Sequence, residues 1–312
     1  MGTSTTVVPR ANQAGLGQDL QLAAEWGSLL LLALAEMTRL WEEHWWTGPL
    51  LLLIACVAWF PEIRLRRMRT WWFVYVAGIF AYSLLRAVAD VTGVPVQSLY
   101  PLRLDRLLFA GIEPGVWLQA HLHPPSGLSN VDYAAVATHW SFFIVPHALA
   151  IGIFLFRRNH FPRYALAMAI TMYVALIFFF LVPTAPPWLA GQWGELPAPG
   201  LARVMDLAGS SLNAPTYQSA YQSLGAANPV AAMPSVHMAI TFVVYLWVRQ
   251  YAPAWRWPCL AYVLVMAFSL IYLGEHYVSD LVAGAVCASI VYFATGRVFE
   301  SAETCRPASV NR

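Results

Sequence analysis

The chain has 312 residues, of which 59% are hydrophobic and only 11% are charged. An ordinary soluble domain is about 45–50% apolar, so this composition excludes a soluble enzyme and predicts a chain that crosses a membrane several times. The net charge of +2 gives no reason to expect a nucleic-acid partner, and the four cysteines lack the spacing of a zinc site or a disulfide framework.

Apolar runs close to the length that crosses a bilayer, about 20 residues, recur along the chain. In chain order, the predicted spans cover residues 71–89, 133–156, 164–182, 232–248, 257–274 and 277–296. Two earlier segments are weaker, because 48–60 is short and 21–40 contains three charged residues. We therefore predict an all-α fold, a multi-span membrane bundle of six to eight transmembrane helices.

These runs also define the expected domains. Residues 1–20 are expected to form a flexible N-terminal tail, residues 21–297 a single membrane-embedded domain, and residues 298–312 a cytoplasmic C-terminal tail. The connection 90–132 is expected to contain a short amphipathic helix, because apolar residues such as Leu107 and Leu108 can line one face of it.

The basic residues set the expected orientation. All 18 are arginine, and links rich in positive charge remain on the cytoplasmic side. They gather in alternate links, at Arg64, Arg66, Arg67, Arg69, Arg157, Arg158, Arg163, Arg249, Arg256 and Arg297. The connections 90–132, 183–232 and 274–277 are then expected to face outward. The prediction is a multi-pass protein of the cell membrane with a cytoplasmic C-terminus.

The segment YLGEHYVSDLVAG, at 272–284, combines a histidine with a carboxylate. His276 and Asp280 are four residues apart, so on a helix they share a face and can form a hydrogen bond. A carboxylate on one ring nitrogen orients the imidazole and makes the other nitrogen a better base or nucleophile. Asp280 is the only charge in its predicted span, so we expect it to face the bundle interior with His276 as its partner.

His237 lies 39 residues before His276, in AAMPSVHMAI at 231–240. One inward span, a short basic turn and one outward span fit this interval, so both histidines are expected at the same face of the membrane. Each feature alone has an ordinary structural explanation, since a lone histidine at a span end is commonly interfacial and Pro234 is a good first-turn residue. Together they predict a catalytic site at the extracytoplasmic face.

The motifs PSVH, at 234–237, and H-YVS-D, at 276–280, resemble the second and third motifs of the type 2 phosphatidic acid phosphatase superfamily, PSGH and SRxxxxxHxxxD. FLVPTAPPW, at 180–188, is similar to the inositol phosphorylceramide synthase (inositolphosphotransferase) branch of that superfamily and its bacterial relatives. The motif-bearing core covers residues 180–284. The chain departs from the phosphatase pattern, because Leu270 replaces the arginine of the third motif and the lysine-containing first motif, KxxxxxxRP, is absent. The synthase branch departs at the same positions.

The resemblance implies an enzyme that transfers phosphoryl or substituted phosphoryl groups in two steps, without a metal or another cofactor. His276 would attack phosphorus and form a phosphohistidine, while Asp280 orients and stabilises its ring. His237 would protonate the leaving oxygen and then take a proton from water or an alcohol acceptor. The expected partners are the bilayer and a phospholipid or prenyl-phosphate substrate, and the sequence predicts no oligomeric state.

The cations that bind the phosphate are not marked by a motif. Arg86, near the outer end of its predicted span, is the first candidate, and an ion pair with Asp90 is the structural alternative. Arg103, Arg106 and Arg203 lie in outer connections and are alternatives that could equally be solvated or bind lipid headgroups.

Other polar groups near the predicted site have less defined roles. Ser235 and the N–H groups at the start of its helix are candidate phosphate donors. His139 is assigned equally to the substrate pocket and to a structural position, whereas His147 is expected to serve packing. Trp188, in the rigid APPW turn, is expected at the bilayer interface.

Three functions remain open from the sequence. The first is a lipid phosphotransferase that moves a phospho-alcohol headgroup onto an acceptor hydroxyl. The second is a lipid-phosphate or prenyl-diphosphate phosphatase with the same site. The third is a proton-coupled transporter, which is disfavoured because transport paths place their ionisable residues near the middle of the membrane and these cluster at one face.

Overall fold

The computed structural model describes residues 68–87, 89, 93–196, 200–211 and 228–304. The chain divides into two compact units, residues 1–76 and 77–312, and the helix α5 (Arg69–Ala87) crosses the boundary between them. The second unit holds every feature discussed below. Its helices are α6 (Leu99–Leu108), α7 (Pro114–Leu122), α8 (Asn130–Ser141), α9 (Val145–Phe156), α10 (Phe161–Leu181), α11 (Pro187–Gln192), α12 (Val204–Ser211), α14 (Val236–Tyr251), α15 (Arg256–Tyr272) and α16 (Val278–Thr304).

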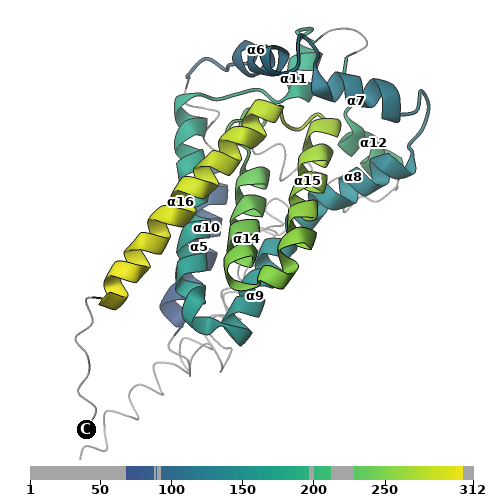
Figure 1. The fold of residues 1–312 in the computed structure, drawn as a ribbon. Coiled ribbons are helices and arrows are strands. Elements are labelled where there is room, and N and C mark those ends of the chain that lie inside the picture. The colour runs from purple at the N-terminus through teal and green to yellow at the C-terminus, as the bar shows by residue number, and fades with distance from the viewer. Residues whose placement is uncertain (1–67, 88, 90–92, 197–199, 212–227, 305–312) are drawn as a thin grey trace, which may run out of the picture. The chain divides into compact units, whose positions relative to one another are not determined.

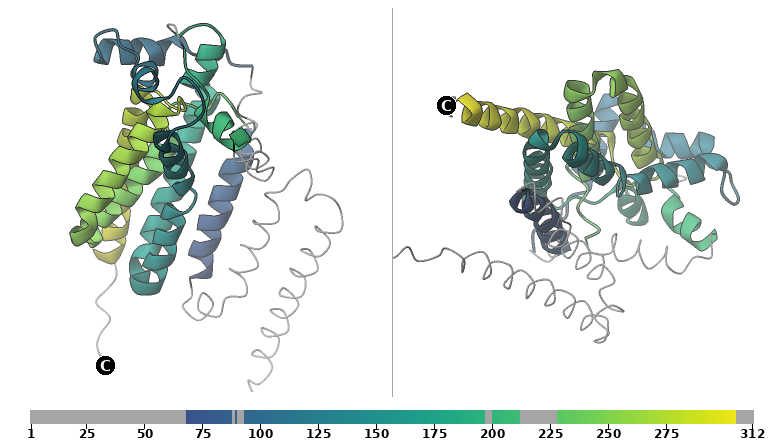
Figure 2. Two further views of the ribbon diagram at one scale, coloured as in Figure 1. Left: turned by 90° about the vertical axis from the view of Figure 1, so that its right-hand side faces the viewer. Right: turned by 90° about the horizontal axis from the view of Figure 1, so that it is seen from below.

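Four long helices form the centre of this unit. Helices α10, α14 and α16 pack against one another, and α15 packs against α14 and α8 (Figure 1). Helices α6, α7 and α11 gather across one end of this bundle, and the turned view in Figure 2 shows the same grouping. The all-α prediction is therefore confirmed for the described residues, which contain isolated β-bridges and no β-strand.

The predicted number of spans is only partly supported. Among the described residues, three helical segments are long and apolar enough to cross a bilayer, 158–181, 253–272 and 278–300. The pair α8 and α9 adds a fourth if the two count as one span. The helix is interrupted between them and bent by 42°, and Pro146 lies in the first turn of α9. Helix α14 has 16 residues, fewer than a typical span, and the predicted segments 21–40 and 48–60 lie outside the described residues.

Helices α14 and α16 pack closely at Gly284. A Cβ atom at this position would lie 2.4 Å from the Ser235 carbonyl oxygen and 3.3 Å from the Ala239 nitrogen. Only glycine leaves room for that backbone, so the small residue sets the distance between the two helices that carry the predicted histidines. A backbone bond from the Ser235 N–H to the Asp280 carbonyl oxygen, 3.0 Å, fixes the same crossing.

The turn between α15 and α16 places His276 beside this crossing. Gly274 has φ +74°, a left-handed conformation that glycine adopts without strain, and it reverses the chain after Tyr272. The N–H groups of Glu275 and His276 both donate to the Leu270 carbonyl oxygen, at 3.1 and 3.2 Å. The backbone that carries His276 is therefore held by the end of α15.

Asp105 of α6 caps the start of α16 from a distant part of the sequence. Its two carboxylate oxygens accept the N–H groups of Val278 at 2.8 Å and Ser279 at 2.9 Å. These are first-turn donors that an α-helix cannot satisfy internally, and a carboxylate there also interacts favourably with the helix dipole. Burial raises the pKa of the Asp105 carboxyl, while the two N–H bonds act in the opposite direction.

The segment PTAPPW joins two other connecting segments. Thr184 forms bridges with Gln97 on one side and Ala231 on the other. The Thr184 N–H donates to the Val230 carbonyl oxygen at 2.7 Å, and the Ala232 N–H donates back to Thr184 at 3.1 Å. The stretch that leads into PSVH is thereby tied to the end of α10.

At the opposite end of the bundle, Arg163 has a role that the sequence did not predict. We expected it to lie in a cytoplasmic link, but it is only 7% exposed, in the first turn of α10. Its guanidinium donates to the Tyr251 hydroxyl at 2.6 Å and to the Tyr292 carbonyl oxygen at 3.3 Å. The Arg163 guanidinium therefore links α10 to α14 and α16 through hydrogen bonds.

Candidate active site

His276 and Asp280 meet at the start of α16. His276 lies two residues before the helix, and its Nδ1 is 3.4 Å from Asp280 Oδ2. The same carboxylate oxygen accepts the Tyr277 N–H at 2.9 Å. Asp280 is fully buried and His276 is 5% exposed. A carboxylate only accepts hydrogen bonds, so the tautomer that suits this contact has its proton on Nδ1 and the lone pair on Nε2.

His237 faces that lone pair from the first turn of α14. Its Nδ1 lies 3.3 Å from His276 Nε2, so the two rings are within hydrogen-bond distance although 39 residues separate them. The structure therefore brings together His237, His276 and Asp280. A carboxylate, an imidazole and a second imidazole therefore lie in a row. In this order the carboxylate can activate the nitrogen of His276, and His237 can carry a proton.

Two aromatic side chains cover the His237 ring. The ring centroids of His139 and Phe142 lie 4.7 and 4.5 Å from that of His237. His139 is 6% exposed, and its Nδ1 has no hydrogen-bond partner among the described residues. His139 thus lies against the predicted proton carrier rather than at the surface of the bundle, which is the placement that a role beside the site requires.

Ser235 is fully buried at the N-cap of α14. Its hydroxyl oxygen accepts the Met238 N–H at 3.2 Å, and its own N–H is taken by the Asp280 carbonyl oxygen. One of the backbone donors that we expected for a phosphate is therefore already bonded. Ser235 begins the helix that carries His237 and holds it against the chain at Asp280.

Arg86 lies at the C-terminal end of α5, within electrostatic range of His237. It exchanges two bonds with the buried Asn228: Arg86 Nη2 donates to the Asn228 carbonyl oxygen at 3.2 Å, and Asn228 Nδ2 donates to the Arg86 carbonyl oxygen at 2.9 Å. The alternative partner, Asp90, lies outside the described residues. No sequence pattern pointed to Asn228, whose role depends on a contact over 142 positions.

The other arginine candidates are placed differently from one another. Arg103 is exposed on α6, and Arg106 forms an ion pair with Glu113. Arg203 lies over the ring of Trp188, 3.7 Å from its centroid. Trp188 itself is 9% exposed, so its predicted place at the bilayer interface is wrong: it packs inside the protein, beneath a guanidinium.

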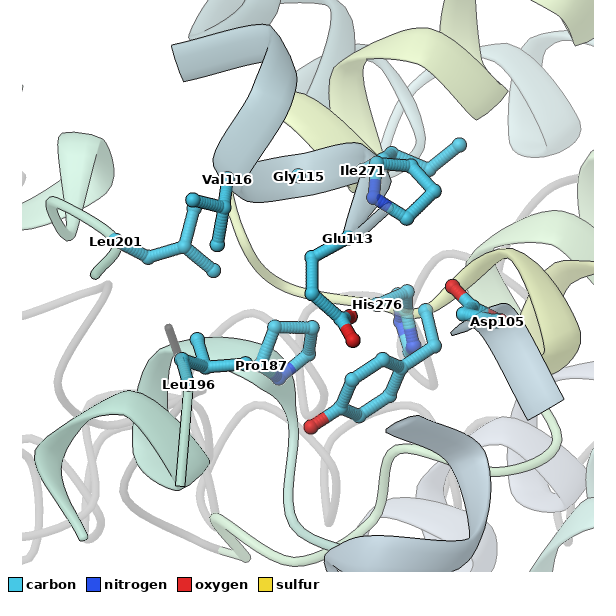
Figure 3. Close-up of a pocket in the computed structure, with 11 residues that line it drawn as sticks. Asp105, Glu113, Gly115, Val116, Pro187, Leu196, Leu201, Ile271 and His276 are labelled. Carbon is cyan, nitrogen blue, oxygen red and sulfur yellow. The ribbon is translucent and has the colours of Figure 1, made fainter. Parts of the chain in front are cut away.

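A pocket opens next to His276, and sequence reasoning missed its other polar residues. It is lined by Asp105, Glu113, Pro114, Gly115, Val116, Pro187, Leu196, Leu201, Ile271, His276 and Tyr277. Figure 3 shows the Glu113 carboxylate directed into this group of residues, between Pro187 and His276. The prediction of an amphipathic helix in 90–132 used only the apolar residues of that connection. Its acidic residues, Asp105 and Glu113, were the signal that could have indicated the pocket.

The described ranges contain no group of three or more histidine, cysteine, aspartate or glutamate side chains arranged to hold a metal ion.

The family model of the PAP2 superfamily matches residues 102–294, more than half of the chain. The chain belongs to the PAP2 superfamily. The match includes all three residues of the predicted catalytic group and confirms the resemblance drawn from PSVH and H-YVS-D. This member of the PAP2 superfamily is a membrane enzyme of lipid phosphate chemistry.

Three named relatives lie in one branch of the PAP2 superfamily. The phosphoinositol dihydroceramide synthase of Bacteroides thetaiotaomicron is 26% identical over 84% of this chain and 86% of its own length. The inositol phosphorylceramide synthase catalytic subunit aur1 of Schizosaccharomyces pombe is 30% identical over 36% of this chain and 26% of its own. The inositol phosphorylceramide synthase of Candida albicans is 26% identical over 49% of this chain and 33% of its own. No solved structure matches the chain.

Proposed function

We propose that this enzyme moves a phospho-alcohol headgroup from one lipid to another through a phosphohistidine on His276. The observation that carries the proposal is the alignment of three side chains, with Asp280 on Nδ1 of His276 and His237 at 3.3 Å from Nε2. A nucleophile oriented by a carboxylate and placed beside a proton carrier is the arrangement that two-step transfer needs.

In the first step, His276 Nε2 attacks the phosphorus of a donor phospholipid. A bond forms between nitrogen and phosphorus, and the bond from phosphorus to the lipid oxygen breaks. His237 gives its proton to that oxygen, so the lipid leaves as a neutral alcohol. Asp280 stabilises the positive charge that develops on the His276 ring.

In the second step, the hydroxyl oxygen of an acceptor lipid attacks the same phosphorus. His237, now neutral, takes the hydroxyl proton, and the bond from phosphorus to nitrogen breaks. His276 and His237 both return to their starting states, so the cycle closes without an external acid or base. The headgroup alcohol remains bonded to phosphorus throughout.

The names of the relatives favour one headgroup. The Bacteroides protein is named for phosphoinositol dihydroceramide and the two fungal proteins for inositol phosphorylceramide. We therefore infer that the headgroup is phosphoinositol and that the acceptor is the hydroxyl of a ceramide-like lipid.

The distribution of arginine supports a site on the extracytoplasmic face with a cytoplasmic C-terminus. Helices α14 and α16 begin at the end of the bundle that holds His237 and His276, and α15 ends there. The basic turns before α10 and α15 belong to the opposite end. Positive charge marks the cytoplasmic side of spans, so the histidines lie on the other side.

We assign to Arg86 the role of binding the negatively charged phosphate. A transferring phosphate needs donors directed at its oxygens, and an arginine is suited to bind two of them. Arg86 acts electrostatically on His237, whereas Arg106 is paired with Glu113. Its reciprocal bonds with Asn228 hold the end of α5 beside the chain that leads into PSVH.

Trapping the intermediate tests the proposal. The purified enzyme receives phosphatidylinositol that carries a phosphorus radiolabel and tritium in the inositol ring, and is quenched in base, where phosphohistidine survives. We expect both labels on the protein in equal molar amounts, because the transferred group includes the alcohol. His276→Ala abolishes labelling, whereas His121→Ala, on the exposed side of α7, retains it.

Three other outcomes would contradict the proposal. Phosphorus without tritium on the protein, together with release of free phosphate, would identify a phosphatase. Labelling that persists in His276→Ala would exclude His276 as the nucleophile. Failure of the enzyme to label or transfer at all, with the fold intact, would favour the transporter hypothesis.

A further inference from the structure

The pocket described above has His276 as one of its lining residues. If the proposed transfer holds, the headgroup alcohol remains attached to the phosphohistidine through both steps. A phosphatase, in contrast, leaves only a bare phosphoryl group on the histidine. A pocket that shares His276 as one of its walls is therefore needed by a transferase and not by a phosphatase.

Tyr277 supplies an unused hydroxyl to this pocket. The residue is 3% exposed and lines the cavity, and its Oη has no hydrogen-bond partner among the described residues. A buried hydroxyl without a partner costs free energy, so such a group in a pocket indicates a ligand atom that completes the bond. A phenol can donate one hydrogen bond and accept others, which matches a ligand hydroxyl.

Glu113 supplies the acceptor. The side chain is buried, and its Oε1 is paired with Arg106 Nε. Figure 3 shows the carboxylate directed into the pocket toward His276. A carboxylate has about four acceptor positions on its two oxygens, so the single bond from Arg106 leaves positions for hydroxyl groups of a ligand.

The charges of the pocket are already balanced. Arg106 neutralises Glu113, and the first-turn N–H groups of α16 bond both oxygens of Asp105. An ammonium headgroup would find the two lining carboxylates, Glu113 and Asp105, already paired, and a second phosphate would meet their negative charges. A neutral ligand with several hydroxyl groups fits both conditions, because it donates to carboxylates and accepts from a phenol.

The lining combines these polar groups with apolar side chains. Apolar side chains of Val116, Pro187, Leu201 and Ile271 form walls of the cavity beside the polar groups. A cyclic polyol has hydroxyl groups at its rim and C–H groups on its faces. Its rim can therefore bond to Glu113 and Tyr277 while its faces lie on the apolar walls.

We propose that Glu113 and Tyr277 form a headgroup subsite that binds a neutral polyol, such as the inositol ring, while phosphorus is bonded to His276. This subsite distinguishes polyol phospholipids from donors with a small or charged headgroup. It rests on the proposed transfer, because it is the transferred group that occupies it.

Two variants and two donors test the subsite. Tyr277→Phe removes one oxygen that bonds to nothing in the described structure, so the fold is retained. We expect kcat/KM for phosphatidylinositol to fall about tenfold and kcat/KM for phosphatidylmethanol, which has no polyol, to stay within about twofold. Glu113→Gln should show the same selective loss. Tyr133→Phe, on the exposed side of α8, is the matched control and leaves both donors unaffected.

Failure of the subsite can be distinguished from failure of the proposed headgroup transfer. An equal loss on both donors, or no loss on phosphatidylinositol, overturns the subsite while headgroup transfer by the unaltered enzyme stands. If the unaltered enzyme transfers no headgroup, inositol 1-phosphate serves as the probe in calorimetry. About tenfold weaker binding to Tyr277→Phe than to the unaltered protein then supports the subsite, and equal affinity overturns it.

Discussion

His237 Nδ1 lies 3.3 Å from His276 Nε2, although the two residues belong to different helices. Ser235 and Gly284 produce this distance, because the backbone of one passes where a side chain of the other would lie. In the proposed mechanism, the chemistry as well as the packing requires this close crossing of α14 and α16. Several consequences of this relationship can be measured.

The first prediction concerns the leaving group. If His237 protonates the lipid oxygen, His237→Gln should lower turnover with phosphatidylinositol about 10²–10⁴-fold. An inositol phosphodiester with a nitrophenyl leaving group needs no such proton, because nitrophenolate leaves as an anion. Formation of the phosphohistidine from that donor should therefore fall less than about tenfold. The two rates are measured by headgroup transfer and by nitrophenolate release in the first turnover.

His276→Gln provides the comparison for this experiment, because it should abolish the reaction with both donors. Equal losses for His237→Gln with both donors would contradict a role in protonating the leaving group. They would indicate that His237 only positions His276.

The second prediction concerns Arg86. Replacing it with glutamine removes the charge assigned to the phosphate, so kcat/KM for phosphatidylinositol should fall about a hundredfold. Arg103→Gln, on the exposed surface of α6, removes an equal charge elsewhere and should change kcat/KM by less than about twofold. Transfer assays in vesicles of one fixed lipid composition compare the variants, and similar losses in both would show that arginine acts only through the membrane surface.

The third prediction tests the helix crossing. Gly284→Ala places a Cβ atom 2.4 Å from the Ser235 carbonyl oxygen, so α14 and α16 must separate. Overpacking of this kind costs about 1–3 kcal/mol, and the separation of His237 from His276 should lower kcat about tenfold or more. Thermal unfolding in detergent and single-turnover labelling of His276 measure the two effects.

Gly152→Ala is the matched control for this substitution. A Cβ atom there meets nothing within 4 Å, and Gly152 lies inside α9. The exchange should stabilise the helix by about 0.5–1 kcal/mol without changing kcat. A Gly284→Ala enzyme with unaltered kcat would show that the histidine distance tolerates movement of the helices.

The proximity of His237, His276 and Asp280 could be predicted from the sequence because all three lie close to helix ends. The four-residue interval of His276 and Asp280 and the 39-residue interval to His237 both follow from spans and short turns. These are local rules, and they place residues on one face without knowledge of the fold.

The supporting residues could not be predicted in the same way. Asp105 caps α16 across more than 170 positions, and Asn228 reaches Arg86 across 142. Such contacts depend on how the outer connections fold over the bundle, and no periodicity encodes that path. The error for Trp188 has a related cause, because its aromatic character alone does not distinguish a membrane interface from a guanidinium inside the protein.

The last prediction concerns pH and the headgroup subsite. Burial raises the pKa of Glu113 above its usual value, and the Arg106 charge offsets only part of this effect. Asp105, His276 and Tyr277 line the same pocket. On acidification, Glu113 therefore gains its proton at a higher pH than an exposed glutamate, and it loses acceptor capacity for ligand hydroxyls. We expect KM for phosphatidylinositol to rise in this range, with no such rise in Glu113→Gln.

Acidification should weaken substrate binding but increase the free energy of unfolding, because the folded state holds the Glu113 proton more tightly than the unfolded state does. The contribution of Glu113 to the free energy of unfolding is then greatest at low pH and decreases as the pH rises through its raised pKa. The unfolding midpoint of the unaltered enzyme should therefore fall relative to that of Glu113→Gln over the pH range in which KM improves. Parallel pH profiles of KM in the two proteins would show that another group governs headgroup binding, since only the unaltered enzyme carries a titrating carboxyl at this position.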